Sequence, residues 1–207
     1  MMARLVVAAI VMTSGVVWAA DAGIAARKMV LLDKSALFKV KLVWVAKNDP
    51  GIAKGPAGEL TDLSGSFEWF YETDGASSVF GCFGLPNDRW IANSDNVAKF
   101  VNPSFEGGGI KKAVVKPAKV AKVTSQFFGE SGGGSLFDGP PTADEGLTVV
   151  LTIENAADSS THRMCSTFAT DSGSTVVLKE VAGGLGRKLL LKNAVPTPTP
   201  CPPTPCS

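Results

Sequence analysis

The residues with the clearest catalytic potential are a serine in a glycine-rich segment and the single histidine of the chain. Residues 129–133 read Gly-Glu-Ser-Gly-Gly, a pattern in which Ser131 could act as a nucleophile. A serine nucleophile needs a base, and His162 is the only histidine available. It follows the serine, whereas proteases with such a loop place histidine first. The sequence therefore favours a flexible loop at Ser131 and a structural or surface role for His162.

Paired carboxylates and metal ligands are the next candidates. Glycoside hydrolysis needs two carboxylates about 5 to 10 Å apart. Glu68 and Glu72 share one face of a predicted strand, but four residues of strand separate them by about 13 Å. Asn93, Asp95 and Asn96 lack the spacing of a calcium loop, and a lone histidine cannot form a zinc site. The sequence predicts no catalytic residue, no metal and no cofactor.

Aromatic side chains within residues 66–72 suggest ligand binding instead of catalysis. Phe67, Trp69 and Tyr71 share one face of this segment, and Trp90 follows a Pro-Asn-Asp loop. An exposed aromatic face can stack on sugar rings, whereas a buried one forms the core. Trp90, Trp69 and Tyr71 are the candidate ligand-binding residues, with Trp90 expected to be the more exposed tryptophan, although burial is the commoner fate of such faces.

Lysines alternate with apolar residues in two segments and could contact an acidic polysaccharide or lipopolysaccharide. The alternative is a solvated face that discourages edge-to-edge strand pairing. The lysines concerned are Lys39, Lys41, Lys47, Lys111, Lys112, Lys116, Lys119 and Lys122.

The cysteines of the chain are Cys82, Cys165, Cys201 and Cys206. An even number in an exported protein predicts disulfides, and four cysteines allow three pairings. Cys201 and Cys206 enclose a stiff Pro-Pro-Thr-Pro spacer, so a direct bridge between them would need a tight loop. We expect Cys165 to pair with one of these two and to hold the C-terminal tail against the domain. Zinc binding is disfavoured because no C-x-x-C spacing is present.

Residues 1–22 have the layout of a secretory signal peptide. Arg4 gives the first residues a positive charge, residues 5–12 form an apolar core, and small residues follow. Cleavage after Ala19 and cleavage after Ala22 both satisfy the small-residue rule. The apolar run is too short for a membrane anchor, and no later stretch approaches about 18 apolar residues. We expect export, without membrane insertion after signal cleavage.

Composition points to a β-rich globular domain. The net charge of +1 over 207 residues argues against a nucleic-acid binder. The 22 glycines and 13 prolines suit many short strands joined by turns. Removal of the signal peptide leaves a chain of ordinary single-domain size, long enough to bury its own core.

Period-two alternation of apolar residues identifies the strands. We predict an all-β fold, a two-layer β-sandwich of about 8–10 short antiparallel strands over residues 25–194. Residues 129–146 form the longest loop and could divide the domain, and residues 195–207 form a disordered Pro/Thr-rich tail unable to pack a core. The predicted strands cover residues 27–33, 38–47, 66–72, 78–83, 96–101, 110–128 as a hairpin turning at Pro117-Ala118, 147–154, 161–168, 175–181 and 187–192.

Residues 27–33, 111–116 and 187–193 share one shape, in which paired basic residues precede an apolar triplet and a charged or polar stop. Further motifs accompany them: Leu85-Pro86-x-x-x-Trp90, Lys99-Phe100, Cys165-Ser166-x-Phe168, Lys192-Asn193-Ala194 and the Pro/Thr tail. Together these motifs resemble those of lysine-rich, β-rich secreted proteins encoded in multiple copies by some environmental bacteria. The resemblance covers most of residues 27–194 and implies an exported β-domain without a known activity, so it assigns no functional residue.

We therefore expect an exported non-catalytic structural or binding protein, located at the cell surface, in the periplasm or in the medium. Its expected partner is a glycan or another cell-envelope component. A secreted hydrolase of polysaccharide or protein is the alternative. A third hypothesis is a fragment of a larger surface protein, because the tail is typical of an interdomain linker.

Overall fold

The computed structural model describes residues 19–34, 39–72, 78–104, 109–127, 140–144, 146–181, 183, 186–197 and 199–203. Within these residues the chain forms two β-sheets, called sheet A and sheet B, and two 3-10 turns, η2 (Leu60–Asp62) and η3 (Asn87–Arg89).

Sheet A has the strand order β1-β11-β10-β4-β5, and β14 pairs with β11. Its pairs are antiparallel except for β1 and β11, which run parallel. Its strands are β1 (Ala19–Gly23), β4 (Leu63–Glu72), β5 (Ser78–Gly84), β10 (Leu147–Asn155), β11 (Ser160–Phe168) and β14 (Val195–Pro196).

Sheet B has the order β12-β13-β2-β3-β9-β8-β7-β6, with every pair antiparallel. Its strands are β2 (Ala26–Lys34), β3 (Lys39–Lys47), β6 (Trp90–Ser94), β7 (Val97–Val101), β8 (Ile110–Lys116), β9 (Val120–Phe127), β12 (Thr175–Glu180) and β13 (Arg187–Lys192).

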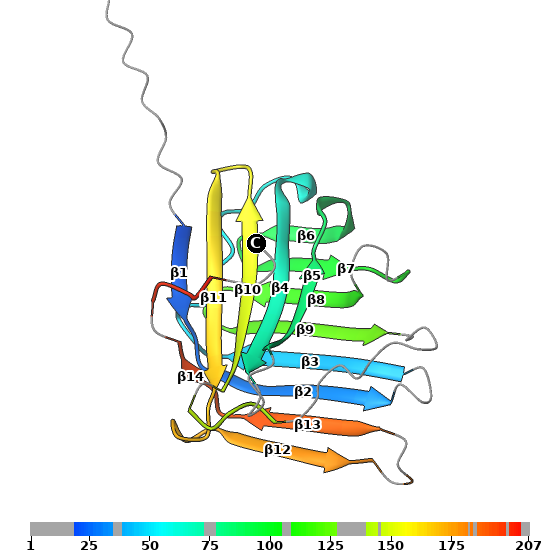
Figure 1. The fold of residues 1–207 in the computed structure, drawn as a ribbon. Coiled ribbons are helices and arrows are strands. Elements are labelled where there is room, and N and C mark those ends of the chain that lie inside the picture. Colours follow the sequence, from blue (N-terminus) through cyan, green and yellow to red (C-terminus); the bar gives the residue numbers. More distant parts are fainter. Residues whose placement is uncertain are drawn as a thin grey trace, which may run out of the picture.

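The two sheets pack face to face and share one hydrophobic core. The strands of sheet A cross in front of those of sheet B (Figure 1). Alternation along β3 turns Leu42 and Trp44 inward, and alternation along β4 does the same for Phe67. The Trp44 and Phe67 rings meet between the sheets with centroids 5.8 Å apart. The predicted all-β two-layer sandwich is confirmed.

The structure also corrects the prediction in detail. More strands are present in the described residues than expected, and one pair is parallel. Residues 90–94, to which no strand was assigned, form β6, because pairing with β7 compensates for the weak strand preference of Ala-Asn-Ser. Four of the five residues of β1, Ala19 to Ala22, lie inside the segment assigned to the signal peptide.

The tail differs most from its prediction. Residues 195–197 and 199–203 lie against sheet A, with Val195 and Pro196 forming β14 and Cys201 buried. The expectation that the tail cannot pack a core is wrong for this part, because a disulfide joins it to β11. The loop at 129–146 falls mostly outside the described residues, and Cys206 lies outside them entirely.

Candidate functional site

Many lysines lie on the outer face of sheet B, and we call this surface the lysine face. Along each strand these lysines occupy the positions that alternate with core-facing residues, such as Lys41 beside the buried Leu42. The strand registers place the lysines on the same side of the sheet. The lysine face comprises Lys28, Lys34, Lys41, Lys47, Lys99, Lys112, Lys116, Lys122, Lys179, Lys188 and Lys192, which are 11 of the 20 lysines and arginines of the chain.

No acidic side chain neutralises this face within the described strands. Asp33 and Glu180 are the acidic residues of the described strands of sheet B. Both occupy positions on the core side of their strands, opposite to the lysine face. Glu180 pairs with Arg187 at 3.2 Å. None of the ion pairs among the described residues involves a lysine of the lysine face. The near-zero net charge of the chain therefore conceals a strongly basic surface.

Cross-strand neighbours divide the lysine face into rows. One row runs across the sheet through Lys192, Lys28, Val45, Lys122, Val114 and Lys99. Another contains Lys179, Lys188, Leu32 and Lys41. Between them lies a mainly aliphatic row made of Val177, Leu190, Val30, Val43 and Thr124, which reaches Lys112 on β8. The two lysine rows are four residues apart along each strand, or about 13 Å.

Two features show that edge protection does not account for the lysines on interior strands. Lysines that prevent sheets from aggregating belong on edge strands, which in sheet B are β12 and β6. Lys28 and Lys122, however, lie on the interior strands β2 and β9. In addition, Lys28 stands directly opposite Lys192, and Lys179 opposite Lys188. Like charges opposite one another destabilise a sheet, so folding alone does not favour this arrangement.

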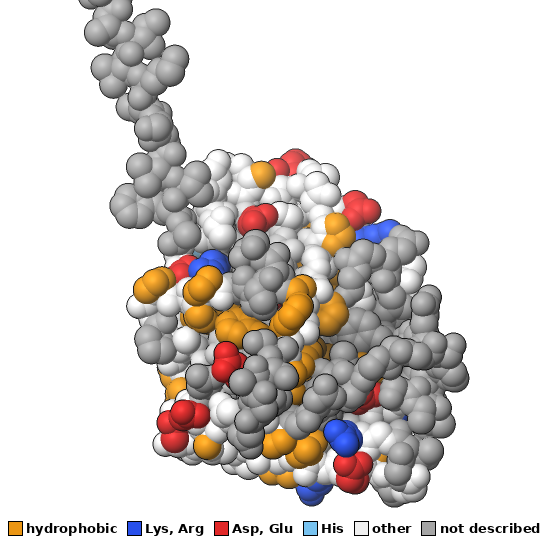
Figure 2. Space-filling view, viewed as in Figure 1, with side chains coloured by type: hydrophobic (Ala, Val, Ile, Leu, Met, Phe, Trp, Pro, Cys, Tyr) orange, Lys and Arg blue, Asp and Glu red, His pale blue; other side chains and the backbone are white. Residues whose placement is uncertain are grey.

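Shallow grooves cross the lysine face. One of about 450 Å³ is lined by Val30, Val43 and Lys41, among others, and a second of about 230 Å³ lies between Lys112 and Lys122. Figure 2 views the opposite side, sheet A, where only scattered basic side chains are visible among acidic and hydrophobic ones.

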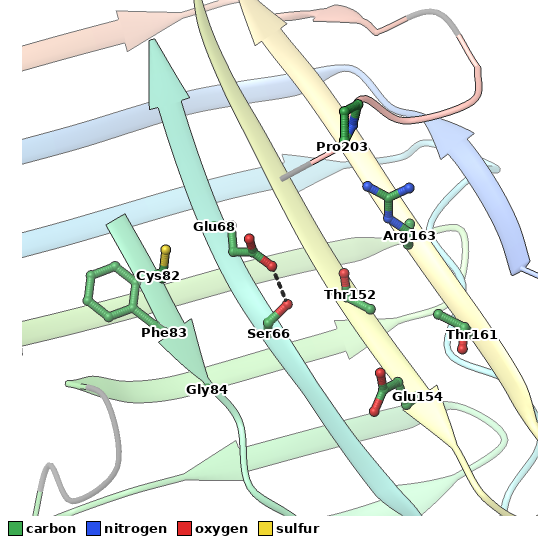
Figure 3. Close-up of a pocket in the computed structure, with 10 residues that line it drawn as sticks. All are labelled: Ser66, Glu68, Cys82, Phe83, Gly84, Thr152, Glu154, Thr161, Arg163 and Pro203. Atoms are coloured by element: carbon green, nitrogen blue, oxygen red, sulfur yellow. Dashed lines mark hydrogen bonds between the residues drawn. The ribbon is translucent and has the colours of Figure 1, made fainter. Parts of the chain in front are cut away.

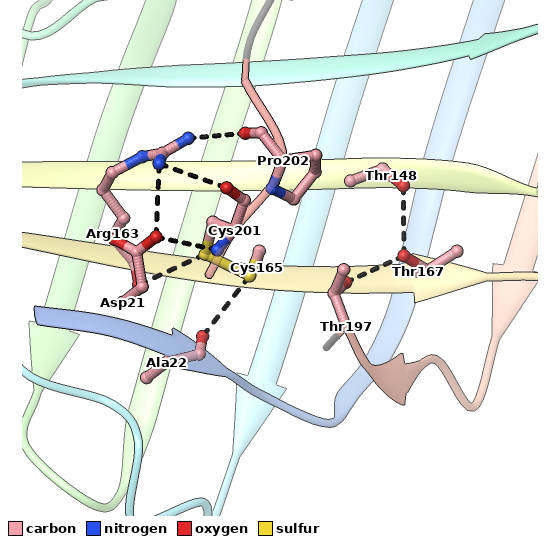
Figure 4. Close-up of a disulfide and its surroundings, with 9 residues drawn as sticks. All are labelled: Asp21, Ala22, Thr148, Arg163, Cys165, Thr167, Thr197, Cys201 and Pro202. Atoms are coloured by element: carbon pink, nitrogen blue, oxygen red, sulfur yellow. Dashed lines mark hydrogen bonds and ion pairs between the residues drawn. A yellow bond between two sulfur atoms is a disulfide. The ribbon is translucent and has the colours of Figure 1, made fainter. Parts of the chain in front are cut away.

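Part of the outer face of sheet A is in contact with the C-terminal tail of the chain (Figure 4). The guanidinium of Arg163 donates to the carbonyl oxygens of Cys201 at 3.3 Å and Pro202 at 2.6 Å, and pairs with Asp21 at 3.3 Å. The Asp21 carboxylate also accepts the backbone N–H of Cys201 at 2.7 Å. We call Asp21, Arg163 and the Cys165–Cys201 disulfide the terminal clamp.

The disulfide confirms that Cys165 pairs with one of the tail cysteines, namely Cys201. With Val150 it forms a small second core, against which Phe70 packs. Cys82 is disulfide-bonded as well.

A polar groove of about 690 Å³ lies beside the clamp (Figure 3). Glu68 is only 5% exposed there, and one of its oxygens accepts a hydrogen bond from the Ser66 hydroxyl at 2.7 Å. Glu154, the other acid of the groove, pairs across the strands with Ser64, four residues from Glu68 along β4 and thus about 13 Å away. This backbone spacing exceeds the roughly 5 to 10 Å that glycoside hydrolysis needs between its carboxyl groups.

His162 lies beside a buried lysine. Lys54 is 1% exposed, and its ammonium donates to the oxygens of Gly55 at 3.0 Å, Pro56 at 3.2 Å and Asn93 at 3.3 Å. Burial lowers the pKa of His162; the Asp158 carboxylate opposes this shift and the Lys54 ammonium adds to it. The ring is therefore neutral at neutral pH, and neither ring nitrogen has a hydrogen-bond partner in the described structure. Ser131 lies outside the described residues.

The predicted aromatic ligand site lies in the core. Trp69, Tyr71 and Trp90 are 1%, 2% and 3% exposed, so their rings cannot stack on a sugar in this conformation. Trp90 packs edge-on against Phe100 with centroids 5.5 Å apart. Trp90 was expected to be the more exposed tryptophan, and its 3% exposure exceeds the 1% of Trp69 and the 0% of Trp44. It is nevertheless buried, because β6 carries it over the core.

The sequence identified part of the lysine face. Lys41, Lys47, Lys112, Lys116 and Lys122 lie on it as expected, whereas Lys119 occupies a turn and the side chain of Lys39 lies outside the described residues. Lys111 sits at a register irregularity of β8. The lysines of β2, β7, β12 and β13 were missed, although period-two alternation in those strands could have revealed them.

No protein-family model, curated protein or solved structure matches this chain. Among the described residues, no helix has the length and apolar character needed to cross a membrane, and no three His, Cys, Asp or Glu side chains converge as a metal site.

Proposed function

We propose that this chain is an exported, non-catalytic binding protein whose lysine face holds an acidic polysaccharide of the cell envelope. The observation that supports this most strongly is the set of lysines on interior strands of sheet B, without acidic partners in the described structure. Their mutual repulsion costs stability, and an anionic ligand would relieve it.

The row pattern favours an extended polymer. A chain lying along the aliphatic row would meet cations on both sides, and each cation would add a weak contact that salt screens. Many weak contacts combine into useful affinity when they belong to one polymer. The aliphatic side chains between the rows suit the apolar faces of sugar rings.

Export is supported by the signal-peptide layout of residues 1–22 and by the Cys165–Cys201 disulfide, since disulfides persist in oxidising compartments. Attachment to an acidic glycan would place the protein at the cell surface, in the periplasm or in the medium. The resemblance to lysine-rich secreted proteins remains a prediction that agrees with this role.

The test is binding of the purified protein to alginate, with dextran of similar length as the uncharged control, by isothermal titration calorimetry at several salt concentrations. We expect binding to alginate alone, weakening roughly tenfold or more between 50 and 300 mM salt. The variant Lys28→Gln/Lys122→Gln should bind at least about tenfold more weakly at low salt.

The matched control is Lys119→Gln/Arg89→Gln, which removes the same charge away from the lysine face and should bind normally. Equal losses in both double variants would mean that net charge, and not the lysine face, drives binding. Absence of alginate binding at low salt would contradict the proposal, and equal binding of duplex DNA would contradict its glycan specificity.

A further inference from the structure

The first described residues of the chain are part of the folded domain. Strand β1 pairs with β11 in register from Ala19 opposite Thr161 to Gly23 opposite Cys165. The next residue, Ile24, is completely buried, and its N–H donates to the Cys165 carbonyl at 2.8 Å.

Asp21 is the residue of β1 with the largest set of polar contacts. Its carboxylate pairs with Arg163 and accepts the Cys201 N–H, as Figure 4 shows. The Asp21 and Arg163 side chains are only 14% and 23% exposed, so water cannot fully replace either partner. Asp21 thus joins the start of the domain to its disulfide-bonded tail.

These contacts distinguish the two cleavage positions that the sequence allows. A cut after Ala22 removes Asp21 and all of β1 except Gly23, and leaves the Arg163 guanidinium without its carboxylate. A cut after Ala19 retains Asp21 and four of the five residues of β1. A removed edge strand would also leave backbone groups of β11 unpaired.

We infer that the precursor is processed between Ala19 and Ala20, so that the mature protein begins with Ala20 and keeps the terminal clamp. A signal peptidase adds water across this amide; Ala19 leaves with the new carboxylate, and Ala20 keeps the new ammonium. The inference rests on the export part of the proposed function and is independent of the ligand.

The experiment uses the full precursor in a secreting bacterial host. The exported protein is analysed by intact mass and N-terminal sequencing, and we expect Ala20 as its first residue. Two substitutions separate the sites, because Val17 is the third residue before the Ala19 cut and Ala20 is the third before the Ala22 cut. Val17→Lys should abolish processing at Ala19, whereas Ala20→Lys should leave it unchanged.

The outcomes are distinct. An exported protein that begins with Gly23, or loss of processing in Ala20→Lys but not in Val17→Lys, would overturn the inference while leaving export intact. An uncut precursor retained in the cell would overturn export and processing together.

A stability readout tests the structural reason. Exported Asp21→Asn should unfold at a lower urea concentration than the unsubstituted protein, with the exposed Asp144→Asn as the control. Equal midpoints for all three would show that the clamp does not depend on Asp21 and would remove the basis of the inference.

Discussion

The outer faces of the two sheets differ in the residues and segments that lie on them. Sheet A has β1 at its edge and the C-terminal tail on part of its outer face, held by the Cys165–Cys201 disulfide and the Asp21–Arg163 ion pair. Sheet B presents a lysine-rich face with no ion pair among the described residues. Sheet A thus uses part of its outer face to hold the ends of the domain, whereas the outer face of sheet B carries charge that no described ion pair neutralises.

Removing the Cys165–Cys201 disulfide should cause the largest loss of stability, and this loss should arise on the side of sheet A. Cys165→Ala/Cys201→Ala opens a loop of 36 residues, and the entropy gained by the unfolded chain should cost about 3 to 4 kcal/mol of unfolding free energy. Urea unfolding of the double variant measures this loss. An unchanged midpoint would mean that the tail adds no stability to sheet A.

The same substitution at two valines allows burial on the outer faces of sheets A and B to be compared. Val150 lies fully buried under the tail, whereas Val43 is half-buried on the lysine face. Val150→Ala should cost about 2 kcal/mol because it leaves a cavity, and Val43→Ala should cost less than about 1 kcal/mol. Equal losses in urea unfolding would show that the two faces are covered to the same extent.

Removing a lysine from the lysine face should have a small effect of the opposite sign. Lys28→Gln relieves the repulsion with Lys192 and should raise the unfolding free energy by about 0.2 to 0.5 kcal/mol at low salt. The gain should shrink at high salt because screening weakens the repulsion in the parent protein. Lys119→Gln, in a turn, serves as the control, and clear destabilisation by Lys28→Gln would contradict this account.

The weakest effect expected is a pH dependence from His162. Its pKa in the folded protein is lowered, so the unfolded chain binds the proton more readily. The stability is fully present above the unfolded pKa of about 6.5 and falls as the pH drops through the lower folded pKa. Unfolding midpoints between pH 7.5 and pH 5 measure this, and His162→Gln should remove this part of the slope. An equal slope in His162→Gln would assign the effect to other groups.

Local patterns were sufficient to predict most of the fold. Alternation in residues such as Val40, Leu42 and Trp44 identifies a strand and its buried face, since side chains of a strand point alternately to opposite sides. The sequence likewise predicted the hairpin turn at Pro117-Ala118, where Ala118 has a positive φ of 55°. Sandwich architecture followed from many such strands.

The site was less predictable. Lys54 sits among glycines and a proline, a context typical of an exposed loop, yet three carbonyl oxygens hold its ammonium inside the protein. Trp90 follows a loop sequence, yet it belongs to the core. Of the Lys54 partners, Asn93 is 39 residues away in sequence. The contact of Trp90 with Phe100 likewise depends on the pairing of β6 with β7. Neither contact can be read from the residues next to Lys54 or Trp90.

The sequence by itself determined most of the strands, their inward and outward faces, and the basic character of individual strands, because these depend on neighbours within a few residues. Only the tertiary structure decided which strands became interior, that the lysines of seven strands form one face, and that Asp21 meets Arg163 and Cys201. Those outcomes depend on strand order and on contacts between residues far apart in the chain, such as Asp21 and Cys201, which local periodicity cannot encode.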